Sequence, residues 1–375
     1  MQARREQALE LMMQFADGTG LTSERPEQRY LWTDAFAVCN FFGLARATGK
    51  SPLAELAFQL VNRVHHVLGR HRADDPRSGW ISALAEEAGE AHPTAGGLRI
   101  GKPLPERQPD ELVDERREWD RDGQYFHYLT KWMHALDQLA RSSGQPLFNV
   151  WARELAQAAH RAFTYTLPHG GSRRMYWKLS VDLSRPLVAS MGQHDPLDGL
   201  VTYAQLQAHA AGPGPNLNDA IADFAAMVEP GRLATGDPLG IGGLLVDACR
   251  IAQLGQQATG IFGLVEPLLE AARAGLQHYT AQPDLRLPAA RRLAFRELGL
   301  AIGLATLEWE GWSAAAGALR GSIDRLARYV PLRGEIEAFW LQPTHRRGDT
   351  WLEHANINDV MLATSLEPAG FLMIQ

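Results

Sequence analysis

Two histidines stand near the predicted starts of helices, where they could move protons. His127 lies in DGQYFHYLTKW, and the residues that share its face at helical spacing are polar: Gln124, Lys131 and His134. His194 lies in MGQHDPLDG, one turn before Asp198. Because an imidazole titrates near neutral pH, we expect His127 and His194 to act as acid or base. The alternatives are a solvated helix face for His127 and a simple helix start at His194 and Asp195.

Acidic residues recur at the predicted helix starts and could serve as catalytic carboxylates. Asp34 lies in WTDAFAVCN, Asp122 ends the acidic run EWDRD, and Asp198 follows His194. Attack on a glycosidic bond needs one protonated and one ionised carboxyl group. We therefore expect Asp34, Asp122 and Asp198 to be catalytic. The alternative is structural, because carboxylates at helix starts also cap the helix and interact favourably with its dipole.

Aromatic, cationic and amide side chains gather in and around the long polar connections between the predicted helices. Aromatic rings can stack on the apolar face of a sugar, and cations can hold anionic groups. The expected substrate-binding residues are Trp80, Trp119, Tyr125, Lys131, Trp177, Lys178, Arg185, Arg296 and Asn358. Basic residues concentrate in these connections although the whole chain is acidic, so an anionic sugar is a candidate substrate. Salt bridges among the connections are the alternative.

Signals for metals and cofactors are weak. VHHVLGRH places His65, His66 and His71 on a predicted helix, but without the glutamate and the spacing of the zinc-protease motif. A structural or solvent-exposed role is the better interpretation of these histidines. The sequence has no P-loop, and its glycine-rich segments do not follow a strand as a dinucleotide-binding loop requires. We expect no metal and no cofactor.

Helical periodicity dominates the chain and must position these residues. The predicted helices are 2–16, 34–48, 52–71, 122–142, 146–165, 198–210, 217–229, 239–256, 260–280, 289–308, 312–330 and 356–367. Strand signals are scarce, apart from a short ribbon within 163–180. Turns within helix pairs are short, whereas connections between pairs are long, above all 72–121 and 166–197. In a ring of hairpins the long connections emerge on one side, so we expect 72–121 and 166–197 to lie together.

This pairing predicts an all-α fold, an (α/α)6 toroid of six helical hairpins with long loops at one mouth. The first and last helices must be adjacent to complete the sixth hairpin, which makes 1–375 a single domain. HDPLDGL at 194–200 is echoed by GDPLGIGGL at 236–244, a separation that suits one hairpin repeat.

Composition narrows the class of protein. The chain has 375 residues, 45% of them hydrophobic and 21% charged, with a formal net charge of -6. This acidic balance gives no reason to expect nucleic acid or an anionic membrane as a partner. The start lacks the apolar core of a signal peptide, and no later stretch is apolar enough to span a membrane. With Cys39 and Cys249 interpreted as reduced core thiols, we expect a cytoplasmic protein; its oligomeric state stays open.

The hairpin rhythm, opened by WTDAFAVCNF and continued by DGQYFHYLTKWMHAL, resembles the (α/α)6-toroid carbohydrate enzymes. These include the N-acylglucosamine and cellobiose 2-epimerases and the unsaturated glucuronyl hydrolases. At residue level the resemblance is confined to Trp-x-Asp helix starts and aromatic-rich inner helices. The epimerases' inner-helix arginine signature has no matching position, so no catalytic pair is carried over. The resemblance implies a toroid and a small, sugar-like substrate.

The residues and the resemblance together predict a carbohydrate-active enzyme, either a sugar epimerase or isomerase or a glycoside hydrolase, that works by side-chain acid/base catalysis. A second hypothesis is a toroid acting on an apolar ligand, in the manner of a terpenoid cyclase, although a cationic mouth disfavours it. A third is a binding protein without catalysis, which would not cluster ionisable groups at one site.

Overall fold

A computed structural model describes residues 2–167, 172–258 and 260–374, and most of them are helical. The chain divides into two compact units. Unit 1 comprises residues 1–18, 43–50 and 229–375, and unit 2 comprises residues 19–42 and 51–228. The single-domain organisation stays a prediction. Among the described residues, none of the helices is both long and apolar enough to cross a membrane.

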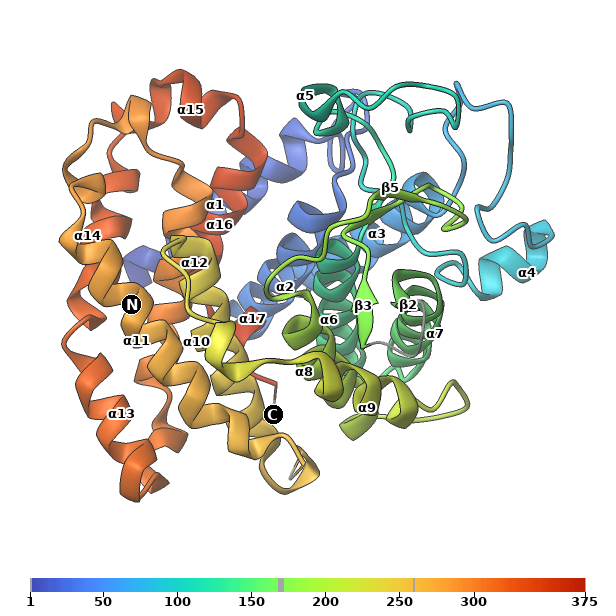
Figure 1. The fold of residues 1–375 in the computed structure, drawn as a ribbon. Coiled ribbons are helices and arrows are strands. Elements are labelled where there is room, and N and C mark those ends of the chain that lie inside the picture. The colour runs from blue at the N-terminus through green and yellow to red at the C-terminus, as the bar shows by residue number, and fades with distance from the viewer. Residues whose placement is uncertain (1, 168–171, 259, 375) are drawn as a thin grey trace. The chain divides into compact units, whose positions relative to one another are not determined.

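Unit 2 contains the helices on which most of the predicted site residues lie. Its helices are α3 (Ser51–Leu68), α4 (Glu86–Ala91), α5 (Glu115–Glu118), α6 (Phe126–Ser143), α7 (Leu147–Phe163), α8 (Asp195–Ala208) and α9 (Asn218–Met227), and it holds the first part of α2 (Leu31–Thr48). Helix α6 packs against α7 and α8, and α8 packs against α9 (Figure 1). The predicted hairpins of 122–165 and 198–229 are therefore present, with their starts shifted by a few residues.

The turn between α6 and α7 shows how the sequence ends one helix and begins the next. Gly144 adopts φ +68°, the left-handed conformation that closes many helices and that glycine reaches without strain. Pro146 then precedes the first residue of α7, where its missing N–H costs nothing. Leu129, Trp132 and other apolar side chains of α6 are fully buried between the helices. Their burial is the main stabilising contribution of this hairpin.

Short strands join the long connections of unit 2 and bring them together. β1 (Gln124–Tyr125) pairs with β4 (Lys178–Leu179), which also pairs with β5 (Pro186–Val188). β2 (Thr164–Thr166) pairs with β3 (Arg173–Met175), which confirms the ribbon predicted within 163–180. The connections 72–121 and 166–197 lie together, as expected, because Arg77 donates to Asp182 at 2.9 Å and Glu106 accepts the backbone N–H of Val181 at 2.6 Å.

Unit 1 contains α1 (Gln2–Gly18) and the C-terminal helices. These are α10 (Pro238–Leu254), α11 (Val265–Ala281), α12 (Ala294–Ala305), α13 (Gly317–Ala327), α14 (Val330–Leu341), α15 (Asp349–Leu352), α16 (Ala355–Leu366) and α17 (Ala369–Leu372). Single 3-10 turns occur at Pro230–Arg232, Gly255–Ala258, Phe262–Leu264, Asp284–Arg286, Ala289–Arg291, Thr306–Glu308, Glu310–Ala314 and His345–Arg347.

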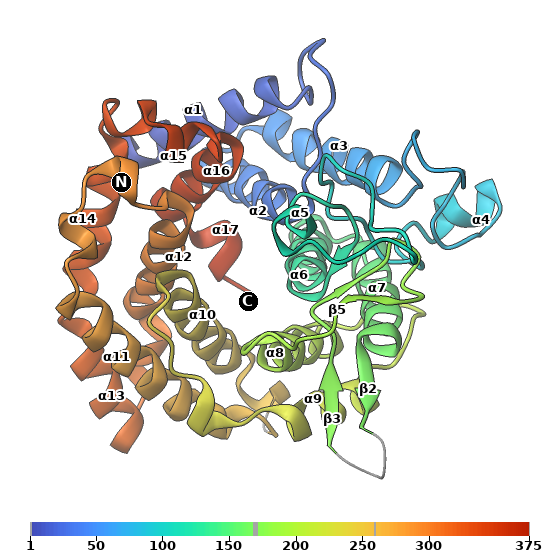
Figure 2. The ribbon, with the colours of Figure 1, turned by 45° about the horizontal axis from the view of Figure 1, so that its top comes forward.

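Helices α10, α12 and α16 form a packed row within unit 1, and α1 packs along α16 (Figure 2). Arg4 of α1 donates a hydrogen bond to the Ser365 carbonyl at 3.2 Å and pairs with Glu337 at 2.8 Å. Helices α10 and α12 approach closely because both carry glycine where they cross. A Cβ atom on Gly303 would lie 2.5 Å from the Cα of Gly242, so a side chain there would force the helices apart.

The predicted hairpin of 289–308 with 312–330 is wrong in its second half. The structure has a 3-10 stretch at Glu310–Ala314, then α13, then a separate helix α14 that the periodicity did not predict. It is α14 that packs against α12, whereas α13 packs against α11. Pro331 lies in the first turn of α14, a position where proline is compatible with a new helix. The sequence prediction ended one helix at residue 330 without beginning the next.

Candidate active site

The first turns of α6 and α8 bring a histidine and an aspartate together in unit 2. His127 is the second residue of α6, and Asp195 is the first residue of α8. The His127 Nδ1 atom lies 4.0 Å from Oδ1 of Asp195, beyond hydrogen-bond distance, and it has no hydrogen-bond partner among the described residues. The Nδ1 atom is buried, but the imidazole as a whole is 30% exposed, so a ligand can reach the rest of the ring. These two helix starts therefore present a potential base beside a potential acid.

Asp198 lies one turn further along α8 and is held by α6. Lys131 places its Nζ atom 2.7 and 2.9 Å from the two carboxylate oxygens of Asp198. Thr130 donates its hydroxyl to the same carboxylate at 2.5 Å. These contacts stabilise the ionised form of Asp198. Asp195, in contrast, accepts one hydrogen bond among the described residues, from the backbone N–H of Gly192 at 3.2 Å.

The different surroundings of these groups shift their protonation. Burial raises the pKa of Asp195 to about 7, and the nearby negative charge of Asp198 adds to the rise. Burial lowers the pKa of His127 to about 4, with Lys131 contributing and Asp198 opposing. At weakly acidic pH the pair therefore consists of a neutral imidazole and a protonated carboxyl group. Such a pair can accept one proton and donate another.

Aromatic rings surround the imidazole of His127. Trp177 lies nearly parallel to it, with ring centres 6.1 Å apart and an interplanar angle of 14°. Tyr125 contacts both rings, and Trp119 meets Trp177 edge to face at 5.3 Å. Trp119 is 56% exposed, whereas Tyr125 is buried. The rings therefore form a continuous aromatic surface, the kind on which the apolar face of a sugar stacks.

A pair of tyrosines completes the surroundings of His127. Tyr128 follows it on α6, and its ring meets the imidazole edge to face at 4.8 Å. The hydroxyl oxygens of Tyr128 and Tyr30 lie 2.6 Å apart, so one hydroxyl donates to the other. Tyr30 immediately precedes α2, which places this contact between two segments 98 residues apart.

Two of the predicted catalytic carboxylates have structural surroundings instead. Asp122 is fully buried; it pairs with Arg99 and accepts the backbone N–H of Gly101 at 3.0 Å. Asp34 accepts the backbone N–H of Tyr30 at 2.9 Å and pairs with Arg29 at 3.3 Å. Burial raises the pKa of Asp34 to about 6, and Arg29 offsets part of that rise. Neither carboxylate has an oxygen left for a substrate, so we do not include them in the candidate site.

Several predicted substrate-binding residues also use their polar atoms within the protein. Lys178 is fully buried and donates to Glu118 at 3.0 Å and to the carbonyls of Glu118 and Arg121 at 2.8 Å each. Arg185 donates to the carbonyl of Arg107. Trp80 is buried beneath the guanidinium of Arg70, whose Cζ atom lies 4.4 Å from the ring centre. These residues hold the long connections in place, and the charge of Lys178 is paired with Glu118.

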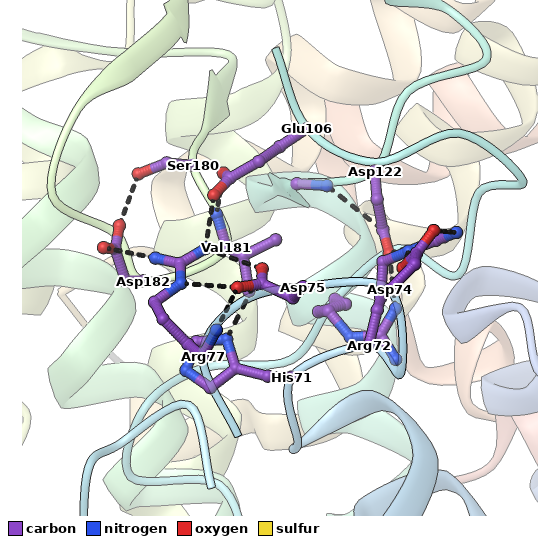
Figure 3. A network of polar contacts seen from close by, with 12 residues as sticks. His71, Arg72, Asp74, Asp75, Arg77, Glu106, Asp122, Ser180, Val181 and Asp182 are labelled. Atoms are coloured by element: carbon purple, nitrogen blue, oxygen red, sulfur yellow. Dashed lines mark hydrogen bonds and ion pairs between the residues drawn. The ribbon is translucent and has the colours of Figure 1, made fainter. Parts of the chain in front are cut away.

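An ion-pair network centred on Arg77 ties the long connections to one another (Figure 3). Arg77 donates to Asp75 at 2.9 Å, to Glu106 at 2.7 Å and to Asp182 at 2.9 Å. Glu106 in turn accepts the backbone N–H of Val181 at 2.6 Å, directly after β4. The network therefore anchors the connection that carries Trp177. Because Arg77 is partly exposed, its pairs are individually weak and act together.

The polar stripe predicted on the helix of His127 is shorter than expected. Gln124 belongs to β1, where it is buried and donates to the carbonyl of Val181 at 2.7 Å. His134 is buried against Gln205, with Nδ1 and Oε1 3.2 Å apart. Of the stripe, only His127 and Lys131 are partly exposed. The strand pairing of Gln124 was not visible in the helical periodicity.

The remaining predicted site residues lie elsewhere. His194 occupies the N-cap position of α8, and its carbonyl accepts the backbone N–H of Asp198 at 2.9 Å. Its catalytic role stays a prediction. Arg296 and Asn358 belong to unit 1: Arg296 pairs with Asp237 at 2.9 Å, and Asn358 is fully buried and donates to the Trp351 carbonyl at 3.0 Å.

Sequence reasoning missed the tyrosine pair and did not include Asp195 among the expected catalytic residues, because a helix start was the alternative interpretation of that aspartate. Neither Tyr30 nor Tyr128 belongs to a motif, and no sequence signal places them together. Asp195 lies at a helix start, where aspartate is common as a cap, but in the structure it makes no side-chain capping bond to α8. Its proximity to His127 was the missing information. In the described part of the chain, no cluster of three or more His, Cys, Asp or Glu residues could hold a metal ion.

Comparison with known proteins identifies the fold. No protein-family model matches the chain, and no curated protein sequence matches it. Among solved structures, the cellobiose 2-epimerase from Spirochaeta thermophila is similar, with a TM-score of 0.50 over 98% of each chain and 12% sequence identity. At this identity the likeness concerns the fold alone. The chain is an all-α protein with the (α/α)6-toroid fold, as the helical pairing predicted.

Proposed function

We propose that the protein is a carbohydrate-active enzyme that epimerises or isomerises a small sugar by proton transfer at carbon. The observation that carries the proposal is the pair formed by His127 and Asp195, with Nδ1 and Oδ1 4.0 Å apart beneath an aromatic surface. The likeness to a sugar epimerase of the same fold supports a sugar as the substrate class. The His127 imidazole is 30% exposed, and Asp195, although its side chain is only 8% exposed, accepts a single hydrogen bond among the described residues, unlike Asp122.

The proposed reaction uses the two groups in opposite roles. The neutral imidazole of His127 accepts the proton on the carbon next to the sugar carbonyl, and the electrons of that C–H bond form an enediolate. The carboxyl group of Asp195 supplies the proton that restores a C–H bond. The imidazolium and carboxylate left behind face each other, so proton return from His127 to Asp195 resets the site. Asp198, kept ionised by Lys131, favours the protonated state of Asp195.

The aromatic surface has a separate role, which is to hold and orient the sugar. Trp177 and Trp119 offer ring faces at the exposed side of His127. Stacking contributes binding energy that is independent of protonation. Lys131 is occupied by Asp198, so a negatively charged substrate is no longer required by the site.

A glycoside hydrolase is the second candidate, because Asp195 and Asp198 form a pair of one protonated and one ionised carboxyl group. Asp198 is less suited to attack a sugar, since Lys131 and Thr130 occupy both of its oxygens. This arrangement ranks hydrolysis below proton transfer.

Solvent exchange distinguishes the two. The purified protein is incubated in D2O with free aldoses, ketoses, N-acylhexosamines, uronates and β-1,4-linked disaccharides, and the products are followed by proton NMR. We expect loss of the C2 proton signal of one substrate together with a new epimer or ketose. Release of reducing ends without carbon-bound deuterium would support hydrolysis. If no sugar is exchanged, cleaved or bound at millimolar concentration, the carbohydrate proposal is wrong.

A further inference from the structure

The tyrosine pair beside His127 carries a hydroxyl proton that the protein does not use. Two phenol groups have two protons, and the contact between Tyr30 and Tyr128, 2.6 Å from oxygen to oxygen, uses one of them. Within the described residues, neither hydroxyl has another hydrogen-bond partner. One O–H group of the pair is therefore available as a donor.

The surroundings keep this pair protonated and therefore able to donate. Burial raises the pKa of Tyr30 to about 12 and that of Tyr128 well above its usual value. The Nζ atom of Lys102 lies 5.4 Å from the centre of the Tyr30 ring, and the negative charge of Asp122 adds to the rise in the Tyr30 pKa. One tyrosine hydroxyl accepts a hydrogen bond from the other. This hydrogen bond polarises the accepting hydroxyl and strengthens the hydrogen bond that it can donate to a ligand.

The position of the pair relates it to the proposed chemistry. Tyr128 meets the His127 imidazole edge to face, with ring centres 4.8 Å apart. Tyr30 and Tyr128 also contact at their rings, 5.5 Å apart at 73°, which fixes the hydroxyls against each other. Removal of a proton next to a carbonyl places negative charge on the carbonyl oxygen, a few ångströms from the base. A fixed donor beside the base suits that oxygen.

We propose that the Tyr30–Tyr128 pair donates its free O–H to the carbonyl oxygen of an open-chain sugar and stabilises the enediolate that forms there. As His127 takes the proton from carbon, the C–H electrons form the carbon–carbon double bond and the carbonyl π electrons move to oxygen. The tyrosine hydrogen bond strengthens as this charge grows. This inference rests on the proposed function and narrows its substrate class to sugars with a free carbonyl.

Kinetics of Tyr30→Phe and Tyr128→Phe test the donor role. The variant that lacks the donating hydroxyl is expected to lose turnover by about a hundredfold with little change in KM, as when a single oxyanion donor is removed, and the variant that lacks the neighbouring hydroxyl is expected to lose less. The double variant should be no worse than the more affected single variant, because the two hydroxyls act as one unit. Additive losses, or turnover within threefold of wild type in both single variants, would overturn the inference.

Two other tyrosines provide matched controls for loss of a hydroxyl group. Tyr165 of β2 stacks on Tyr176, the residue after β3, and Tyr165→Phe should leave turnover unchanged. Tyr203 is buried and donates to the Ala156 carbonyl at 2.7 Å, so Tyr203→Phe should lower Tm without a selective effect on kcat. A fall in Tm like that of Tyr203→Phe, with no effect on kcat in the Tyr30 or Tyr128 variants, would assign the pair a structural role.

Binding of an enediolate analogue separates this inference from the proposed function. We use erythronohydroxamate as the analogue and erythritol, which has no carbonyl, as its reference, with Kd from calorimetry and the tyrosine Cζ resonances from NMR. Expected results are tighter binding of the hydroxamate, a shift of the Tyr30 and Tyr128 signals, and an affinity loss of about tenfold in either phenylalanine variant. These results without sugar turnover would uphold the donor pair and reject the isomerase. Sugar turnover without these binding results would uphold the isomerase and reject the donor pair. If neither turnover nor the binding results are observed, both proposals are rejected.

Discussion

Asp122 lies four residues before α6 and Asp195 begins α8, so both aspartates lie near the start of a helical hairpin in unit 2, but their hydrogen-bond partners and neighbouring charges differ. Asp122 is fully buried with Arg99 against one oxygen and the backbone N–H groups of Gly101 and Gly123 on the other. Asp195 has one backbone N–H donor, a neighbouring carboxylate and an imidazole 4.0 Å away. Both oxygens of Asp122 are therefore hydrogen-bonded within the protein, whereas Asp195 has few partners and can gain or lose a proton.

The difference shows that position at a helix start does not decide the role of a carboxylate. A carboxylate whose oxygens are fully hydrogen-bonded is held ionised and contributes to stability. One that is buried beside another negative charge keeps its proton to higher pH and can donate it. Substitution of the two aspartates and of their partners should therefore separate stability from catalysis.

The largest expected effect is on turnover, from substitution of His127. His127→Gln keeps a polar side chain of similar size but removes the base, so kcat should fall by roughly a hundredfold to ten-thousandfold. Because Nδ1 of His127 makes no hydrogen bond within the protein, Tm should change little. Initial rates on the sugar found by solvent exchange, with thermal unfolding in parallel, measure both quantities.

His92→Gln is the matched control for that substitution, since His92 is half exposed and pairs with Glu154 away from the helix starts. It should retain wild-type kcat. Full turnover in His127→Gln would remove the base from the proposed mechanism and leave His194 as the next histidine to examine.

The second prediction concerns stability at Asp122. Asp122→Asn leaves Arg99 buried without its ionised partner, so the free energy of unfolding should fall by about 3 kcal/mol. Chemical denaturation measures this change, and kcat per folded molecule should stay near wild type. Asp120→Asn, at an exposed residue two positions earlier, should change stability by less than about 0.5 kcal/mol. A loss of kcat without a loss of stability would return Asp122 to the catalytic residues.

Much of the fold could be predicted because helix pairing is a local property. The hairpin of α6 and α7 follows from an apolar stripe, a glycine at its turn and Pro146 at the next helix start. The separation of α13 from α14 was missed because two helices follow each other with Pro331 in the first turn of the second. A proline at this position is consistent both with the end of one helix and with the start of the next. The packing of α14 on α12 shows that a new helix starts there.

The site could be predicted only in part, because hydrogen bonding over long sequence distances decides which polar groups are free. His127 and Asp198 were predicted from residue type and spacing alone. The sequence could not show that Arg99 would occupy Asp122, or that Lys178 would be buried on Glu118. Tyr30 meets Tyr128 across 98 residues, a contact that only the packed structure reveals.

The third prediction is a bell-shaped dependence of kcat/KM on pH. The base His127 must be neutral, so activity should rise with pH through about 4; the acid Asp195 must be protonated, so activity should fall above about 7. Each limb should change about tenfold per pH unit. Rates between pH 3.5 and 9 on a substrate that does not itself titrate would show it. A rate that keeps rising above pH 8 would contradict the role of Asp195 as acid.

The last expected effect is a pH-dependent gain in stability from Asp195→Asn. The folded protein holds the Asp195 proton up to about pH 7, whereas an unfolded aspartate releases it near 3.8, so wild-type stability falls as pH rises between these values. The amide carries no charge, so relative to wild type the variant should gain stability as the pH rises from 4, where the two proteins are equal, to 8. Denaturation at both pH values measures the difference. Asp219→Asn, at an exposed residue in the first turn of α9, provides the control and should show no pH-dependent gain. If Asp195→Asn and wild type are equally stable at pH 8, the ionised Asp195 is stabilised by the protein as well as Asp122 is. The contrast between the two carboxylates would then no longer hold.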